Sequence, residues 1–517
     1  MKKNYYFLLV AICVLIINFT AQFAFAQWTT NVAVNTPICT ADTFQFSPVI
    51  VSDGAGGAII AWEDYRNQNQ NQNVDIYVQR VDAFGDTLWK ADGIQVCSDL
   101  SKQSYPRICS DGAKGAIIAW TDYRGIIGAD IYAQRVDSSG VTKWTPGGVV
   151  ISAAASAQEF SSTFPQICSD GAGGAIIIWM DRRNHPPNGW DVYAQKINGN
   201  GNVQWQADGV PVCTALLDQE QPVLVSDNAG GAIAAWKDQR NGSWDIYAQR
   251  LRSSDGHALW GSNELAICTT SVGAKSKPGI ASDGGNGAYI VWGDPRGSGN
   301  EVYAQRVDSS GNVKWVTDGI SVCTFSSSKF NPVITSGESN DAFIAWEDSR
   351  NMLNTALDIY AQRIDTTTSP LLWNPNGAVV TEAPNPQTNP MIVSDQQSGV
   401  IVCWEDNRNL SQTDIFAQRL QGSNGMRLWY LGNNADGIPI ALAPACNKNG
   451  QVITTDCGKG AIIAWQDNRS VTQEDIFAQN IRLDGSVGKP SLGAPNLESV
   501  TDVLWDQGAR VSLRWGR

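Results

Sequence analysis

Histidine is almost absent from this 517-residue sequence, which has only His185 and His257. A histidine-based metal cluster and a Ser-His-Asp triad both need imidazoles in matching places, so neither is expected. No Cys-x-x-Cys pair occurs either, which leaves little basis for a zinc site. We therefore expect no metal ion and no other cofactor.

Long apolar runs are missing after residue 26, where no segment approaches the ~20 apolar residues of a bilayer-spanning helix. The first 26 residues hold two lysines, an apolar run from Tyr5 through Ile17, and Ala-Phe-Ala before Gln27. This pattern predicts a secretory signal peptide over residues 1–26. A retained membrane anchor is the alternative, although the run is short for a span. We expect a protein that is secreted or at the cell surface, without a membrane span.

Basic residues are fewer than acidic residues. Without the two lysines of the signal peptide, 35 basic residues stand against 50 acidic ones, a net charge of −15. This charge disfavours nucleic acid and anionic membrane surfaces as partners, because both are polyanions. We expect a monomer with a carbohydrate or protein ligand.

The sequence is rich in one repeat of 54–61 residues, which occurs eight times and is clearest at Pro106–Trp144. Each copy is interpreted as three strands and the start of a fourth. Gly and Asp in the Ser-Asp-Gly and Asp-Ser-Ser-Gly stretches favour turns, while Ile, Val, Tyr and Trp fill the strands. The Ser-Asp-Gly stretch lacks the spaced oxygens of a calcium loop, so we interpret it as a hairpin turn. The tryptophan of the second strand marks the period at Trp62, Trp120, Trp179, Trp236, Trp292, Trp346, Trp404 and Trp465.

The second strands, such as Ala116–Trp120, are continuously apolar, which predicts sheets that are buried on both faces. Sheets stacked around an axis give every copy two neighbours, and the repeat length suits a propeller blade better than a solenoid coil. The last copy lacks a fourth-strand tryptophan, and the N-terminal region supplies one at Trp28. The sequence predicts an all-β fold: an eight-bladed β-propeller of four-stranded blades over 27–488, with the last blade closed by the N-terminal strand.

Two short segments follow the repeats. Residues 489–496 are rich in Pro, Gly and Ser and predict a linker. Residues 497–517 alternate like a strand pair and resemble the opening strands of a fibronectin type III-like module. About twenty residues cannot form such a sandwich, so this segment is interpreted as the truncated start of a module.

Ten cysteines remain after the signal peptide, and most recur at equivalent positions of the repeat. Cysteines placed in this way behave like small core residues, so we expect mostly unpaired, buried thiols. The pairs that a disulfide framework would favour are Cys97 with Cys109, and Cys446 with Cys457.

Trp-x-Asp-x-Arg occurs in all eight copies, and its three side chains share one strand face. We expect the arginine to pair with the acid that opens the third strand. A protein needs one active site, whereas this motif occurs eight times. We therefore interpret the motif as structural and assign no catalytic residue. The third-strand glutamine, such as Gln79, is expected to tie one blade to the next. The residues given this structural role are Asp64, Arg66 and Asp75; Asp122, Arg124 and Asp130; Asp181, Arg183 and Asp191; and Asp238, Arg240 and Asp245.

Two family resemblances rest on these motifs. Asp137 and Gly140 before Trp144 resemble the Asp-box turn of sialidase-type propellers, although Arg135 stands where that motif has Ser. The combination of Trp-x-Asp-x-Arg with Asp-Ile-Tyr-Ala-Gln-Arg, over residues 28 to about 488, is more closely similar to an uncharacterised family of exported bacterial β-propellers. That resemblance implies a fold and a location, and no activity.

The loop after the arginine varies most between copies, and variable loops on one face of a rigid ring are the usual binding surface. Trp190 and Trp244 occupy equivalent places in adjacent copies. Exposed indoles there would stack on a sugar ring; the alternative is that both fold onto the neighbouring blade. The candidate binding residues are Trp190, Trp244, His185, Tyr65 and Tyr123.

Two functions follow from this pattern. The first is an exported, non-catalytic binding or spacer module for glycan, polymer or protein ligands at the cell exterior. The alternative is a sialidase-like glycoside hydrolase, and a carboxylate-pair variant of it would need two carboxylates roughly 5–10 Å apart in a pocket.

Overall fold

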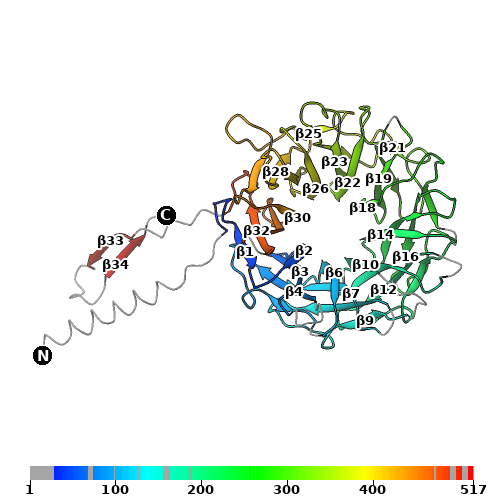
Figure 1. Ribbon diagram of the computed structural model, residues 1–517, viewed down its shortest axis with the longest axis horizontal. Coiled ribbons are helices and arrows are strands. Elements are labelled where there is room, and N and C mark those ends of the chain that lie inside the picture. The colour runs from blue at the N-terminus through cyan, green and yellow to red at the C-terminus, as the bar shows by residue number, and fades with distance from the viewer. Residues whose placement is uncertain are drawn as a thin grey trace.

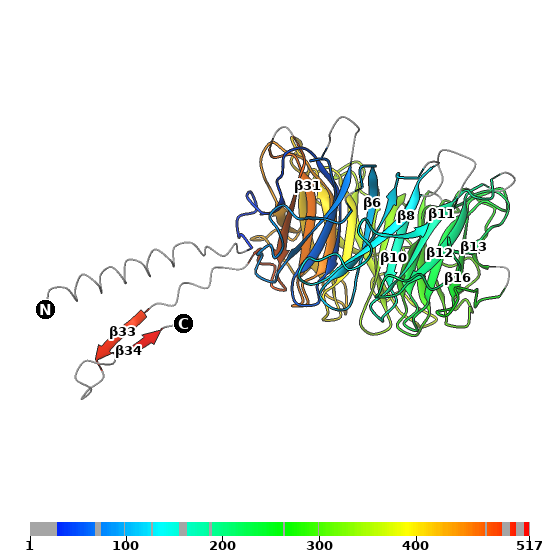
Figure 2. The same cartoon turned by 90° about the horizontal axis from the view of Figure 1, so that it is seen from below.

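The computed structural model describes residues 28–488, apart from 68–73, 98, 126–127, 155–162, 186–188, 262–263, 298 and 471–472, together with 497–502 and 511–515. The predicted signal peptide and linker lie outside the described residues. Eight four-stranded antiparallel sheets surround a central axis (Figures 1 and 2). This is the eight-bladed β-propeller that the repeats predict. The described part of the chain contains no helix that is long and apolar enough to cross a membrane.

The blades are numbered by the order of their second-strand tryptophans, from Trp62 in blade 1 to Trp465 in blade 8. Blades 1 to 4 consist of β2 (Gln45–Ser52), β3 (Ala58–Asp64), β4 (Asp75–Val81) and β5 (Ile94–Gln95); β6 (Gln103–Ser110), β7 (Ala116–Asp122), β8 (Asp130–Val136) and β9 (Val149–Ser152); β10 (Thr163–Ser169), β11 (Ala175–Asp181), β12 (Asp191–Ile197) and β13 (Val210–Cys213); and β14 (Gln219–Ser226), β15 (Ala232–Asp238), β16 (Asp245–Leu251) and β17 (Leu265–Cys268).

Blades 5 to 8 repeat this order. They consist of β18 (Gly279–Ser282), β19 (Ala288–Asp294), β20 (Glu301–Val307) and β21 (Ile320–Ser321); β22 (Lys329–Ser336), β23 (Ala342–Asp348), β24 (Asp358–Ile364) and β25 (Ala378–Thr381); β26 (Gln387–Ser394), β27 (Val400–Asp406), β28 (Asp414–Leu420) and β29 (Ile438–Ala441); and β30 (Lys448–Thr455), β31 (Ala461–Asp467), β32 (Asp475–Ile481) and β1 (Thr36–Cys39).

The N-terminal strand closes the ring. In blade 8, β1 pairs antiparallel with β32, and Thr36 lies opposite Ala478. The amide of Asn35 also donates to the carbonyl of Ile440 in blade 7, at 2.8 Å. Trp28 is buried in the core between blades 8 and 1. The predicted closure is confirmed: β1 covers the edge of β32 and gives the last blade the same number of strands as the others.

The first strand of each blade lies nearest the axis, and adjacent first strands contact each other around the ring (Figure 1). The second strands are buried along almost their whole length, as their apolar sequence predicts. Their tryptophans are fully buried and pack between neighbouring blades; Trp120, for example, meets Ile59 and Ala61 of blade 1. The hydrophobic core is therefore a ring of similar clusters, one at each blade junction.

The third-strand glutamine works within its own blade, which corrects the expected link between blades. The Gln79 amide donates to the carbonyl of Lys90 at 2.8 Å, while its oxygen accepts the backbone N–H groups of Arg80 and Trp89. These bonds hold the turn into the fourth strand against the third strand. The segment that leads into the fourth strand lies directly beside the third strand, so the glutamine side chain reaches it within the same blade.

All ten described cysteines are free, and eight of them are buried. Neither of the two candidate disulfides forms. Beyond the ring, β33 (Leu497–Asp502) and β34 (Val511–Trp515) pair antiparallel, as the alternating pattern predicts. The fibronectin type III-like assignment of this segment stays a prediction.

Candidate functional site

The Trp-x-Asp-x-Arg motif forms a closed cluster on one strand. Asp64 accepts the indole N–H of Trp62 at 2.8 Å through Oδ2. The Arg66 guanidinium binds both oxygens of the same carboxylate, at 2.8 and 2.6 Å. The arginine therefore pairs with the aspartate of its own motif, and the predicted pairing with Asp75 is wrong. Side chains two residues apart share a face, so the planar guanidinium folds back onto its neighbour in a bidentate pair.

The same arginine also joins two blades. Arg66 lies over the Tyr77 ring, 4.0 Å from its centroid, and donates to the sulfur of Cys39 in the preceding blade at 3.0 Å. The recurrent cysteine is thus an acceptor as well as a core residue. Equivalent guanidinium–sulfur contacts occur at Arg124 with Cys97, Arg240 with Cys213, Arg296 with Cys268 and Arg350 with Cys323.

The acid that opens the third strand has other partners. Asp75 lies opposite Asp64 in the sheet register and accepts the Asn67 amide at 2.8 Å. Burial raises the pKa of this carboxyl. The same cause raises the pKa of the equivalent carboxyls in blades 2, 6 and 8 to about 6, at Asp130, Asp358 and Asp475.

These raised pKa values predict how stability depends on pH. The pKa of the Asp130 carboxyl is about 6 in the folded ring, against an ordinary value of 3.8. Its contribution to stability is fully present below pH 3.8 and is lost as pH rises through 6. Asp130→Asn is always neutral, so it should raise the free energy of unfolding by about 1 kcal/mol at pH 7, after allowance for solvent screening. The gain should vanish near pH 4, as measured by urea unfolding at the two pH values.

Asp137 provides a control, because its pKa is shifted in the opposite direction from that of Asp130. The Ser139 hydroxyl and neighbouring backbone amides bind its carboxylate, and they lower its pKa to about 2. Its contribution is present above pH 3.8 and is lost as pH falls through 2. Asp137→Asn should therefore lower stability at pH 7. A gain of stability at pH 7 in both variants would contradict the opposite pKa shifts of the two carboxyls.

Trp190 and Trp244 lie at equivalent places just before β12 and β16, and both indoles are half-buried. Each stacks on a cation of its own blade: the Arg182 guanidinium carbon is 4.5 Å from the Trp190 ring centroid, and the Lys237 ammonium is 4.3 Å from that of Trp244. The Trp190 carbonyl accepts the Gln219 amide of the next blade at 2.6 Å. The backbone is thus fixed by the neighbouring blade, whereas each ring lies on its own blade and is partly exposed.

The other candidate residues lie on the same end of blades 1 to 3. Tyr65 packs edge-on against Phe46, with ring centroids 5.5 Å apart. Tyr123 is 36% exposed and has the Lys102 ammonium 5.4 Å from its ring centroid. His185 is half-buried, and its backbone N–H donates to the carbonyl of Arg182 at 3.1 Å. Residues 186–188 of this loop lie outside the described part.

Three further aromatic side chains belong to this surface and were missed from the sequence. Phe44 stacks on Phe46 at 5.6 Å between centroids, and Phe44 is exposed. Tyr105 lies near both Tyr65 and Tyr123, and it contributes to the raised pKa of each phenol, of which burial is the main cause. We name the surface the aromatic face, which consists of Phe44, Phe46, Tyr65, Tyr105, Tyr123, Trp190 and Trp244.

The aromatic face lies on blades 1 to 4. At the same end, blade 6 carries the exposed Phe325 and Phe330, and Phe330 is the equivalent of Phe46. The position of Tyr65 is aromatic in blades 1 and 2 alone; in blades 3 to 8 it is occupied by Arg182, Gln239, Pro295, Ser349, Asn407 and Asn468.

Tyr105 precedes Pro106 in a first strand whose register shifts between Ser104 and Arg107, a shift that the sequence alone does not reveal. That irregularity gives Tyr105 a φ of 59°. Strand bulges of this kind re-aim side chains.

The acids near this surface bind backbone groups. Glu63 is buried, and its carboxylate accepts the Tyr105 amide of the next blade at 2.7 Å. Glu347 accepts the Asn389 amide at 2.8 Å in the same way. Burial raises the pKa of the Glu63 carboxyl. These carboxylates connect consecutive blades at separate junctions.

A hollow of about 730 Å³ lies among the first strands of blades 3 to 7. Its lining includes Gln166, Gln221, Lys277, Asn331 and Met391. Among the described residues that line it there is no Asp, Glu, His or Tyr, the side chains that act as acids, bases or nucleophiles on glycosidic bonds. Burial and the nearby charge of Arg107 lower the pKa of Lys277.

Comparisons with known proteins give no family: no family model and no curated protein matches the chain. Similar solved structures include a puromycin hydrolase, at 14% identity and a TM-score of 0.38, with 70% of this chain and 52% of that chain covered. A Hadza microbial sialidase is 11% identical with a TM-score of 0.35, and the match covers 61% of this chain and 66% of that one. A protein of unknown function from Dyadobacter fermentans is 10% identical, with a TM-score of 0.35 and coverage of 61% and 94%. The chain thus spans about half of the puromycin hydrolase and slightly under two thirds of the sialidase.

Proposed function

We propose that this protein is an exported, non-catalytic β-propeller that binds a carbohydrate chain on the aromatic face. The observation that carries the proposal is the gathering of aromatic rings at one end of blades 1 to 4. At the position of Tyr65, blades 1 and 2 have tyrosine, whereas blades 5 to 8 have Pro, Ser and Asn; blades 3 and 4 supply Trp190 and Trp244 from the following loop. The core needs no such difference between blades, because it is built from the same residues in all of them.

The chemistry of the aromatic face suits sugars. Flat apolar rings stack on the C–H faces of pyranoses, and half-buried indoles keep one side accessible while their orientation is fixed. Arg182, Lys237 and Lys102 lie against the rings and provide hydrogen-bond donors for hydroxyl or carboxylate groups. The sialidase-like alternative requires acids that converge at the axis of the ring, and the described lining of the axial hollow has none.

Truncating the indoles should weaken binding with little loss of fold. Trp190→Ala and Trp244→Ala are each expected to lower carbohydrate affinity by ~1–3 kcal/mol, which is roughly fivefold to 150-fold. A glycan array on the recombinant ring identifies the ligand, and calorimetric titration then measures the affinity of each variant.

Tyr430 provides the matched control, because it is an exposed aromatic residue in blade 7, away from the aromatic face. Tyr430→Ala should bind the ligand like the unaltered protein. Equal loss in all three variants would place binding elsewhere, and a ring that binds no glycan would leave the spacer interpretation in its place.

A further inference from the structure

A cation fixes the hairpin between the first and second strands in seven of the eight blades. In blade 1, Asp53 accepts the hairpin amides of Ala55 and Gly57 through Oδ1, and its Oδ2 binds Arg80 of the third strand at 2.7 Å. The same pair recurs as Arg135 with Asp111, Lys196 with Asp170, Arg250 with Asp227, Arg306 with Asp283, Arg363 with Asp341 and Arg419 with Asp395. Blade 8 differs, because Asn480 stands at the position of the cation.

This cation also spans the junction to the next blade. Arg80 donates to the carbonyl of Ser138 in blade 2 at 3.0 Å, and the Trp89 indole donates to the same carbonyl at 3.2 Å. Arg250 and Trp260 share the carbonyl of Ser309 in the same way. The guanidinium groups of five blades connect a carboxylate of one blade with a turn carbonyl of the next; they belong to Arg80, Arg135, Arg250, Arg306 and Arg363. In blade 7, Arg419 binds Asp395, and among the described residues the Trp429 indole alone donates to the turn carbonyl of Leu483 in blade 8.

The junction from blade 8 to blade 1 lacks these contacts. Asn480 reaches Asp456 at 3.1 Å, but an asparagine is too short to extend on to blade 1. The carbonyl equivalent to that of Ser138 belongs to Ala83, and among the described residues no donor binds it. The Nε1 atom of Trp28, which is equivalent to that of Trp89, is buried without a hydrogen-bond partner in the described structure.

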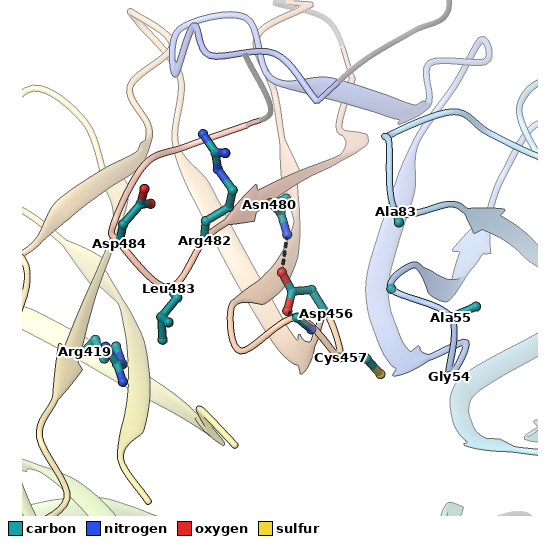
Figure 3. Close-up of a pocket in the computed structure, with 12 residues that line it drawn as sticks. Gly54, Ala55, Ala83, Arg419, Asp456, Cys457, Asn480, Arg482, Leu483 and Asp484 are labelled. Carbon is teal, nitrogen blue, oxygen red and sulfur yellow. Dashed lines mark hydrogen bonds between the residues drawn. The ribbon is translucent and has the colours of Figure 1, made fainter. Parts of the chain in front are cut away.

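A pocket of about 820 Å³ opens where the cation is missing (Figure 3). Its charged lining residues are Asp456, Asp484, Arg419 and Arg482, and Ala83 and Asn480 also line it. The Arg419 guanidinium is already paired with Asp395 of blade 7. Figure 3 shows the Arg482 side chain extending away from Asp456, so it does not replace the missing group. Asp456 is half-buried, whereas its seven equivalents are at most 6% exposed.

The polar atoms of this junction are poorly satisfied. Asn480 is 3% exposed, and its Oδ1 has no hydrogen-bond partner among the described residues. Asp456 has lost its cation, and its Oδ2 accepts a neutral amide in place of a charged donor. An uncompensated carboxylate and unpaired buried acceptors cost free energy that a suitable donor would recover.

We propose that the pocket between blades 8 and 1 is a binding site for a guanidinium group. The group would occupy the place of the missing arginine, donating to the carboxylate of Asp456 and to the carbonyl of Ala83. A planar fork with five N–H donors fits acceptors on both sides of the junction. The molecule itself holds a bridging guanidinium at five other junctions, and in blade 3 Lys196 shows that an ammonium also fits. The site lies at the opposite end of the blades from the aromatic face.

Calorimetric titration of the full chain tests the site with three probes of similar length. N-acetyl-arginine amide is expected to bind one-to-one and saturably. N-acetyl-lysine amide should bind more weakly, and the neutral citrulline analogue should not bind. Equal binding of the arginine and citrulline compounds would overturn the proposal, because recognition of the cation is its basis.

Two variants locate the binding. Asn480→Arg restores the repeat, so it should abolish binding and raise the melting temperature. Asp456→Asn removes the carboxylate and should weaken binding roughly tenfold or more, the scale of one hydrogen bond to a charged group. Unchanged affinity in both variants would overturn the proposal.

The repeat also provides a matched gain of function. Arg80→Asn reproduces the blade 8 arrangement at the junction of blades 1 and 2. This variant should melt at a lower temperature and bind a second equivalent of the arginine compound, which should restore part of the lost stability. A stoichiometry that stays at one would contradict the assignment of the pocket to the missing cation.

The source of the guanidinium is distinguished by a second ligand. A short peptide with one internal arginine is titrated beside the single amino-acid amide. Tighter binding of the peptide assigns the site to an arginine of a protein partner, whereas equal binding assigns it to a small guanidinium compound. If neither binds, the proposal fails.

Discussion

Deleting residues 28–39 is expected to unfold the whole ring and not a single blade. These residues supply Trp28, which is 1% exposed, and the buried Ile38 and Cys39 of the core between blades 8 and 1. Losing this apolar burial costs at least about 5 kcal/mol, which is comparable to the total stability of many domains. The deletion also leaves β32 with an unpaired edge and removes the sulfur that accepts from Arg66. Urea unfolding followed by tryptophan fluorescence measures the loss.

The control for this deletion removes residues 497–517. Their two described strands pair with each other, so the midpoint of ring unfolding should not change. A truncated N-terminus that keeps the full midpoint would show that closure by β1 contributes nothing to stability. If only blade 8 loosened while the other blades stayed protected from hydrogen exchange, the ring would not unfold as a unit.

The fold was predictable because its signals are repeated. The apolar second strand and its buried tryptophan occur eight times, so one interpretation of Ala116–Trp120 applies to every blade. Closure was predictable because Trp28 replaces the tryptophan that the last copy lacks. The partners of repeated polar residues were not predictable in the same way. The carboxylates of Asp64 and Asp75 are both candidates for pairing with Arg66. Which one the guanidinium binds depends on the side-chain conformation of Arg66, and the sequence does not give that conformation.

The candidate site was only partly predictable, for a related reason. Trp190 and Trp244 are visible because they break the repeat in a loop. Phe46 and Tyr105 lie in first strands, where aromatic residues look like core, and the bulge that re-aims them appears only in the structure. Asn480 departs visibly from the repeat, because the other seven copies have Arg or Lys at this position. Its effect on the junction can be inferred only from the contacts that those side chains make in the structure.

Removing one arginine of the Trp-x-Asp-x-Arg cluster should have the second large effect. Asp122 is fully buried, and its carboxylate is bound by Arg124 and by the Trp120 indole. Arg124→Ala leaves this charge in the interior without its cation, and such a loss costs about 3–5 kcal/mol. It also removes the contact with Cys97 of blade 1 and the stacking on Tyr132. The free energy of unfolding should fall by this amount, while glycan binding by the folded protein should not change.

Arg124→Lys and Arg252→Ala make this prediction specific. A lysine keeps the charge but not the bidentate fork, so its loss of stability should be intermediate. Arg252 pairs with Asp255 at the surface, where both side chains are exposed, so Arg252→Ala should leave the unfolding midpoint unchanged. If Arg124→Ala were as stable as Arg252→Ala, the cluster would not support the ring. An effect on glycan affinity without an effect on stability would place Arg124 in the binding site, because a residue that acts through packing changes stability first.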